Sequence, residues 1–191
     1  MKKNNKLNKS FTRTGFTLVE TLVAISIFTT SILGLMSVLA SSISNTNYVK
    51  QKIIASYLAQ EGIEYVRSMR DTYVLYSAAN GEDWSSFKGE LNSCRLTNNG
   101  CGIDNSVSMI DSDFIFQCAP TSKCALFLNN GNYAANSTIG ADSGFIRRIR
   151  MDRMGLPLDA DETKILSTVS WTQGSGSYSI TFSENLFNWV E

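Results

Sequence analysis

One stretch near the start of the chain decides the fold. Residues 15–40 read GFTLVETLVAISIFTTSILGLMSVLA, and no charged residue occurs from Thr21 to Val49. A helix rises ~1.5 Å per residue, so about 20 apolar residues cross the hydrocarbon core of a bilayer. The sequence therefore predicts a membrane-spanning helix over residues 16–40.

The segment before this helix is basic. The first 15 residues carry five cations and no acid, namely Lys2, Lys3, Lys6, Lys9 and Arg13. The whole chain holds 17 basic and 17 acidic side chains, so the part after Gly15 is net negative. Cationic flanks of a membrane span stay in the cytoplasm. We therefore expect a single-pass membrane protein whose N-terminus is cytoplasmic and whose head lies outside.

Two simpler interpretations of the apolar run stay open at this point. A secretory signal peptide has a shorter apolar region followed by a small-residue cut site, and Ala40-Ser41-Ser42 is compatible with such a site. A plain signal anchor is the second alternative. Glu20 argues against both, because a carboxylate costs about 2.5–3.5 kcal/mol at the centre of a bilayer, and less near the interface.

A buried carboxylate needs a cationic partner. Within the chain the nearest candidates are Arg13 and Lys9 in the basic segment. Cleavage between Gly15 and Phe16 would create a different partner, an α-amino group four residues before Glu20. In a bundle of identical helices, Glu20 of one subunit could then meet the amine of a neighbour.

These residues carry a family resemblance. The basic leader, Gly15-Phe16-Thr17-Leu18-Val19-Glu20 and the apolar run resemble the processing motif of type IV prepilins, and residues 20–27 look most like minor pilins and type II secretion pseudopilins. The resemblance implies that a prepilin peptidase cuts after Gly15 and that Phe16 becomes the N-methylated terminus. It also implies that Glu20 serves filament assembly, with other pilin subunits and an inner-membrane assembly platform as partners.

Beyond the span, an apolar stripe predicts that the helix continues over residues 16–72. Its members recur at three- and four-residue steps, which is the period of one helix face: Ile54, Leu58, Gly62, Tyr65, Met69 and Tyr73. After it we expect a head over residues 73–191. The segment Asp83–Leu91 resembles a short capped helix.

The second half of the chain predicts antiparallel strands. They are expected at Phe114–Cys118, Ala125–Asn129, Phe145–Met151, Ile165–Thr172 and Ser177–Phe182, with a hairpin loop at residues 173–176. The fold class is thus α+β, a long N-terminal helix packed on an antiparallel sheet, which is also the arrangement that the pilin resemblance implies. Val169 and Trp171 should share a sheet face and point toward Tyr65 and Met69, and Trp189 should also be buried.

Four cysteines are expected to form disulfides, which an extracytoplasmic head permits. Of the three possible connectivities, we favour the local pairs Cys94–Cys101 and Cys118–Cys124, because each closes a short loop. The alternative is a tetrathiolate metal site. Its ligand spacing would differ from the tight spacing of zinc knuckles.

We find no pattern for catalysis. The chain has no His, the commonest general base and metal ligand, so we expect neither an enzyme nor a cofactor. Asp159, Asp161 and Glu162 resemble a solvated turn more than a calcium loop. A basic strand at Arg147, Arg148, Arg150 and Arg153 is expected to show its charges to solvent or guard a sheet edge, although such a cluster can also contact DNA phosphates.

The sequence therefore predicts a structural subunit, a minor pilin or pseudopilin, found in the membrane and in an extracellular or periplasmic filament. The rival prediction is a membrane-anchored binding or adhesion module, in which the helix only tethers the head. Nucleic acid is not expected as a partner, because the chain after the leader is net negative and repels phosphate.

Overall fold

The structure, a computed structural model, describes residues 15–76, 83–95, 99–109, 111–135, 140–152 and 161–188. The predicted leader before Gly15 lies outside these residues, as do Arg153, Asp159 and Trp189. The chain divides into two compact units, one ending at Thr46 and one beginning at Asn47. Helix α1 (Leu18–Tyr76) supplies all the regular structure of the first unit and the first element of the second.

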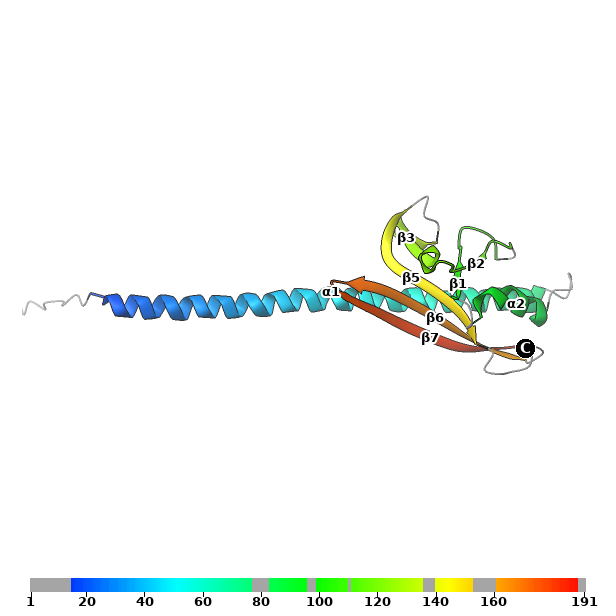
Figure 1. Cartoon of the computed structure of the whole chain (residues 1–191). Coiled ribbons are helices and arrows are strands. Elements are labelled where there is room, and N and C mark those ends of the chain that lie inside the picture. The colour runs from blue at the N-terminus through cyan, green and yellow to red at the C-terminus, as the bar shows by residue number, and fades with distance from the viewer. Residues whose placement is uncertain are drawn as a thin grey trace, which may run out of the picture. The chain divides into compact units, whose positions relative to one another are not determined.

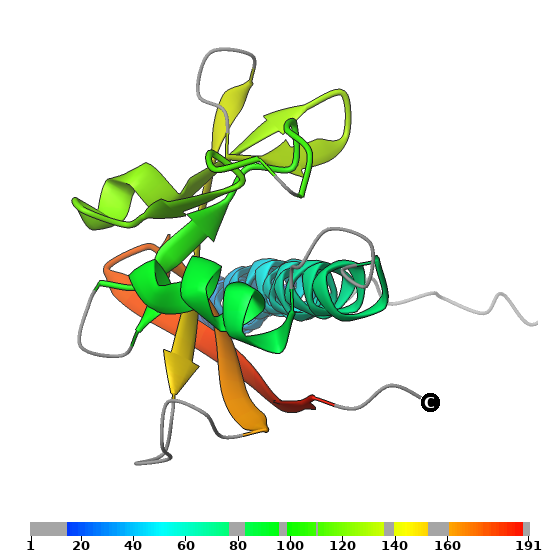
Figure 2. The ribbon, with the colours of Figure 1, turned by 90° about the vertical axis from the view of Figure 1, so that its right-hand side faces the viewer.

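The second unit is an antiparallel sheet packed on α1 (Figures 1 and 2). Its strands are β1 (Cys101–Ile103), β2 (Ile115–Gln117), β3 (Ala125–Asn129), β4 (Asn132–Ala134), β5 (Ala141–Asp152), β6 (Glu162–Gln173) and β7 (Gly176–Phe187). Helix α2 (Trp84–Glu90) and the 3-10 turn η2 (Leu91–Cys94) lie between α1 and β1 in the sequence, and the 3-10 turn η3 (Thr121–Cys124) lies between β2 and β3. The predicted α+β fold is confirmed.

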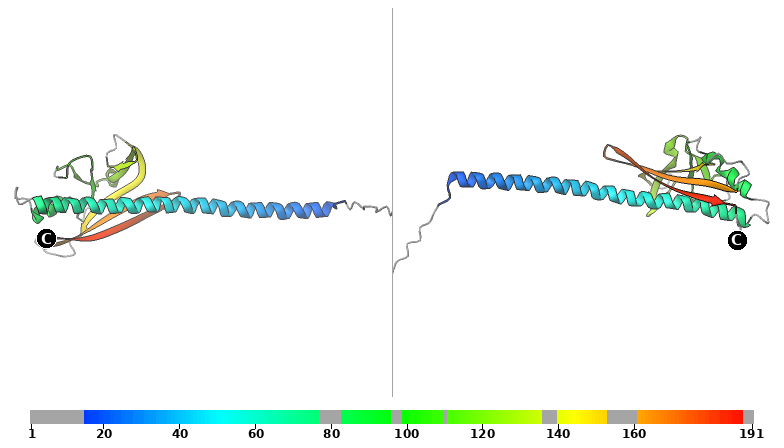
Figure 3. Two further views of the ribbon diagram at one scale, coloured as in Figure 1. Left: turned by 180° about the vertical axis from the view of Figure 1, so that it is seen from behind. Right: turned by 90° about the horizontal axis from the view of Figure 1, so that it is seen from below.

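Strand β5 is the centre of the sheet. One edge pairs with β3 through residues 141–146 and with β1 at Ile149, and the other edge pairs with β6. β7 continues the sheet beyond β6, and this hairpin runs alongside α1 (Figure 3). The basic segment that contains Arg147 and Arg148 is therefore an interior strand, so the predicted role as guard of a sheet edge is wrong.

The β6–β7 hairpin was predicted, but both strands are longer than the predicted Ile165–Thr172 and Ser177–Phe182. Twelve residue pairs run without a bulge from Glu162 opposite Phe187 to Gln173 opposite Gly176. Gly174 adopts φ +58, which suits a tight hairpin turn. At the far end polar side chains hold the strands together, since Asn185 Nδ2 donates to Glu162 Oε1 at 2.8 Å. Alternation of apolar residues cannot predict this end of the hairpin, because its side chains are polar.

The core has two parts along α1. The larger contains Ile63, Val66, Met69 and Tyr73 with α2 and the ends of β5 and β6. The smaller contains Ala55, Leu58 and Ala59 with four residues of the sheet, namely Leu126, Phe145, Val169 and Trp171. The predicted stripe is thus the buried side of α1, although Ile54 and Tyr65 lie at its margins and are only partly buried.

Trp171 and Val169 share the helix-facing side of β6, as predicted. Their predicted position along α1 is wrong, because they pack near Tyr48 and Ala55–Ala59 and not near Tyr65 and Met69. The rings of Trp171 and Phe145 lie 6.2 Å apart, and Tyr178 stacks on Trp171 at 5.8 Å. The hairpin register decides this position, because the β6 end next to the turn meets the start of the second unit.

We predict that Trp171→Ala lowers the free energy of unfolding of the second unit by about 3–5 kcal/mol, the usual loss for a buried aromatic side chain. Trp171 is 5% exposed and its ring contacts three aromatic neighbours. Denaturant unfolding of residues 47–191 measures the loss. Tyr57→Ala is the matched control, because Tyr57 is 70% exposed. Equal stability of wild type and Trp171→Ala would show that this face of β6 is not core.

Candidate functional site

The predicted cleavage site lies directly before α1. Gly15 and Phe16 precede the helix, which begins at Leu18, and the Phe16 side chain is 77% exposed. No described residue packs around Gly15, since a Cβ built there meets nothing within 4 Å. Gly15 and Phe16 are therefore accessible.

Glu20 lies in the first turn of α1. Its backbone N–H donates to Thr17 Oγ1 at 3.3 Å, so Thr17 caps the start of the helix. Thr followed three residues later by Glu is the sequence signature of a capping box, and this signal could have placed the helix start at Leu18. An acid here also meets the favourable N-terminal end of the helix dipole.

The Glu20 carboxylate itself has no partner among the described residues. None of their hydrogen bonds or ion pairs reaches it, and the residue is exposed. The cap uses the backbone of Glu20 and the side chain of Thr17. The carboxylate is therefore available to a cation outside the described part of this chain.

Five hydroxyl groups of the first unit are satisfied within the helix. Each donates to a carbonyl three or four residues earlier, at 2.7–3.0 Å; the five are Thr21, Ser26, Thr29, Thr30 and Ser31. Such bonds let Ser and Thr sit in an apolar medium without unpaired donors. They explain how five hydroxyl residues fit into a span.

The apolar side chains of this unit are exposed. Helix α1 contains the one described segment that is long and apolar enough to cross a membrane, and none of that segment is buried. Large exposed side chains include Leu22, Ile25, Phe28, Leu33 and Leu39. A surface of this kind needs cover from lipid or from other protein chains.

The four cysteines form the local pairs predicted from the sequence, Cys94–Cys101 and Cys118–Cys124. All four are buried. The first pair joins η2 to β1, and the second joins the end of β2 to η3. The tetrathiolate alternative is therefore not adopted.

An ion pair joins α1 to the sheet. Arg147 is 2% exposed, and its Nη1 donates to Glu61 Oε2 at 2.7 Å. The guanidinium group lies 5.4 Å from the centre of the Tyr65 ring. Arg147 was predicted as part of a solvated strand face, and that prediction is wrong. Its alternation partners Phe145 and Ile149 correctly place it on the buried face.

Glu61 accepts two hydrogen bonds at this contact. Its second oxygen accepts from the Tyr65 hydroxyl at 3.0 Å, and Asn105 Nδ2 donates to the same hydroxyl and to the Tyr133 carbonyl, each at 3.2 Å. Burial raises the pKa of Tyr65, which keeps its proton available to Glu61. The predicted stripe had placed Glu61 off the core side of the helix, and no sequence signal pointed to Arg147 as its partner.

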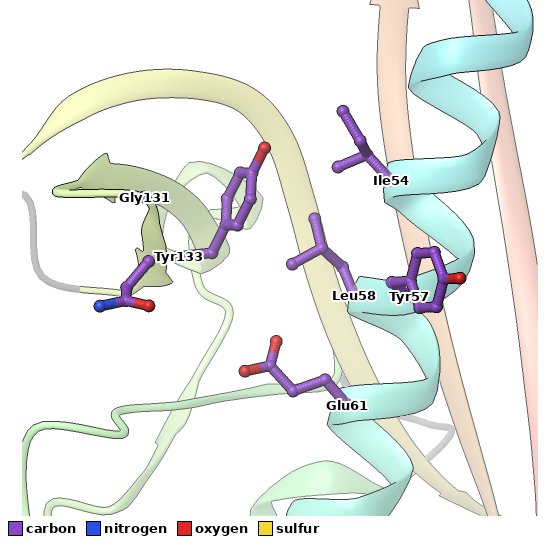
Figure 4. A pocket seen from close by; sticks show the side chains of 7 residues that line it. Ile54, Tyr57, Leu58, Glu61, Gly131 and Tyr133 are labelled. Atoms are coloured by element: carbon purple, nitrogen blue, oxygen red, sulfur yellow. The ribbon is translucent and has the colours of Figure 1, made fainter.

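Next to Glu61 lies an open groove between α1 and the β3–β4 hairpin (Figure 4). It encloses about 470 Å³ and is lined by Ile54, Tyr57, Leu58, Glu61, Gly131, Asn132 and Tyr133. Both Glu61 oxygens already accept hydrogen bonds, so the groove offers mainly an apolar surface. Its chemistry suits an apolar contact and supplies no reactive group.

The acidic turn at Asp161 and Glu162 behaves as a solvated turn in its described part. Asn188 Nδ2 donates to Asp161 Oδ1, and Asn185 donates to Glu162. Within the described residues, no three His, Cys, Asp or Glu side chains are close enough to hold a metal ion.

Comparisons with protein-family models, curated proteins and solved structures found no match to this chain.

We predict that Glu61→Ala destabilises the second unit by about 2 kcal/mol. Breaking a fully buried pair costs roughly 3–5 kcal/mol, and the partial exposure of Glu61 reduces the loss. The double variant Glu61→Leu, Arg147→Met should recover most of the stability, because no buried charge is left unpaired. Denaturant unfolding checks both. If the double variant is less stable than Glu61→Ala, the pair itself is the stabilising element.

Proposed function

We propose that this chain is a structural subunit of a type IV pilus-like filament, a minor pilin or pseudopilin that is cut after Gly15. The observation that carries the proposal is the start of α1. An exposed apolar helix begins at Leu18, two residues after Phe16, and its first turn holds one carboxylate without a partner in the described residues.

Cleavage would give this carboxylate a natural partner. It would place a new α-amino group at Phe16, at the same end of the helix as Glu20. Methylation of that nitrogen leaves it protonated, so the positive charge persists. Within one helix the Thr17 cap already fixes Glu20 by its backbone, and the amine of a neighbouring subunit is the cation that assembly would bring. The pair would exist only after cleavage and only between subunits.

The same proposal assigns the partners and the location. A prepilin peptidase would act on Gly15, an inner-membrane assembly platform would lift the subunit, and other pilin subunits would cover the apolar helix. The N-terminus would face the cytoplasm and the disulfide-bonded head would lie outside. Disulfides persist in oxidising compartments, which supports that side for the head.

The second candidate is a membrane-anchored binding or adhesion module. The apolar groove between α1 and the β3–β4 hairpin favours it, because such a groove suits a partner surface. The two functions predict different locations for the protein. A filament subunit is recovered in surface filaments removed by shearing, whereas a tethered module stays with the membranes.

We expect Gly15→Val to block processing, because the resemblance implies a peptidase that needs a small residue at this position. The uncut precursor should accumulate in the membrane and migrate more slowly on a denaturing gel. Gly34→Val is the control, since Gly34 also has open space around it but lies outside the motif. Normal cleavage of Gly15→Val would contradict the assigned site.

We expect Glu20→Gln to be cleaved and inserted normally, but depleted in sheared filaments about tenfold, which corresponds to ~1.4 kcal/mol. Gln has nearly the same shape as Glu and keeps the backbone N–H that donates to Thr17, so only the charge is removed. Thr17→Ala removes the cap and keeps the charge, so it should enter filaments at close to the wild-type level. Quantitative blots of filaments and membranes measure both.

Equal incorporation of Glu20→Gln and wild type would show that the carboxylate does not pair between subunits. If Thr17→Ala is depleted as strongly as Glu20→Gln, the requirement is for a correctly capped helix start and not for a charge.

A further inference from the structure

The sheet face that points away from α1 carries two arginines on the central strand. Arg148 and Arg150 alternate with the buried Arg147 and Ile149, so both project to this outer face. Across the sheet, Arg148 lies opposite Thr168, which lies opposite Thr181. Arg150 lies opposite Leu166, which lies opposite Ser183.

Neither arginine has a partner in the described part of the chain. The ion pairs there involve Arg67, Arg70 and Arg147, and the Nε atoms of Arg148 and Arg150 are buried without a hydrogen-bond acceptor. A buried donor left unpaired costs free energy, and such a group calls for an acceptor that the described residues do not supply.

The two side chains are also held close together. Residues two apart on one strand are separated by roughly 7 Å, so the two guanidinium groups repel each other unless an anion lies between them. Gly100 of the neighbouring segment makes room for their stems. A Cβ there would lie 3.0 Å from Arg150 Cγ and 3.7 Å from Arg148 Cβ.

Two acids on the same face have contacts of their own. Asp152, which lies across the ladder from Lys164, is not free, and Glu162 accepts a hydrogen bond from Asn185. Across the sheet from Arg148 lie Thr168 and then Thr181, whose hydroxyl oxygens are 2.9 Å apart and carry no charge. The two arginines thus concentrate positive charge on one strand of a chain that is net negative after Gly15.

We propose that Arg148 and Arg150 form a binding site for a phosphate-class oxyanion on the outer face of β5. Each guanidinium presents paired donors in a planar fork that matches phosphate oxygens, and charge-assisted bonds of this kind are the strong ones. The hydroxyl of Thr168, across the sheet from Arg148, is buried and hydrogen-bonded to Thr181, so the two guanidinium groups supply the donors. The phosphate is either free in solution or part of a phosphodiester chain. This site is independent of filament assembly.

The test is a titration of the full-length protein in detergent micelles, followed through the arginine Nε–Hε NMR signals. Inorganic phosphate should shift the signals of Arg148 and Arg150 and leave Arg67 unchanged, because Arg67 is occupied by Glu64 and Glu184. A ten-residue oligothymidylate is the second probe. Tighter binding of the oligothymidylate identifies a phosphodiester chain, and equal or weaker binding identifies free phosphate. Either result supports the site.

Variants separate an oxyanion site from general positive charge. The double variant Arg148→Lys, Arg150→Lys keeps both charges but loses the forks, so affinity for phosphate should fall about tenfold. Lys123→Gln removes one cation from η3 and should stay within about twofold of wild type. An unchanged thermal midpoint confirms that the double variant is folded.

Three results would overturn the proposal. The Arg148 and Arg150 signals fail to move with either probe, the lysine variant binds phosphate as well as wild type, or sodium chloride at equal ionic strength produces the same shifts. The last result means an adventitious ion only.

Discussion

The structure depends on where helix α1 buries its apolar side chains. From Asn47 onward, α1 buries one face against the sheet, with Ala55, Leu58, Val66 and Met69 in the core. Before Thr46 its large apolar side chains are exposed all round. Apolar area favours burial at about 25 cal/mol per Å², so the first segment needs a cover that the described residues do not provide. Lipid and then neighbouring helices are the covers that our account assigns.

The contact of α1 with the sheet is set by its closest approach. A Cβ at Gly62 would lie 2.5 Å from Ser167 Oγ and 2.9 Å from Ile149 Cδ1, so only glycine fits there. One residue earlier, Glu61 meets the buried Arg147. A buried ion pair adds little net stability compared with apolar packing. Its value here lies in register, because sliding the helix by one turn would leave Arg147 without its carboxylate.

Much of this fold could be predicted from residue patterns. The long helix, both disulfides and the β6–β7 hairpin follow from a 3.6-residue period, short cysteine loops and a glycine turn. Strands β1 and β4 could not be predicted, since three residues with a central Gly102 or Tyr133 carry no alternation. The Arg147–Glu61 pair also could not be predicted from the sequence. A charged residue in an alternating strand is normally solvated, and its partner lies far away in the sequence.

The residues at the start of α1 have two separate roles, which the sequence pattern alone does not distinguish. Thr17 and the backbone of Glu20 cap the helix, a local requirement of the fold. The carboxylate of Glu20 is left over, and only a charge from outside the described residues can use it. The Thr17 side chain and the Glu20 backbone thus start the helix, and we propose that the Glu20 carboxylate serves assembly through an ion pair between subunits.

The measurement that tests this account most directly is the intact mass of the protein sheared from the surface of its native host. Our account predicts the mass of residues 16–191 with both disulfides closed and one methyl group added at Phe16. A chain beginning after Ser42, or an uncut chain beginning at Met1, would contradict it.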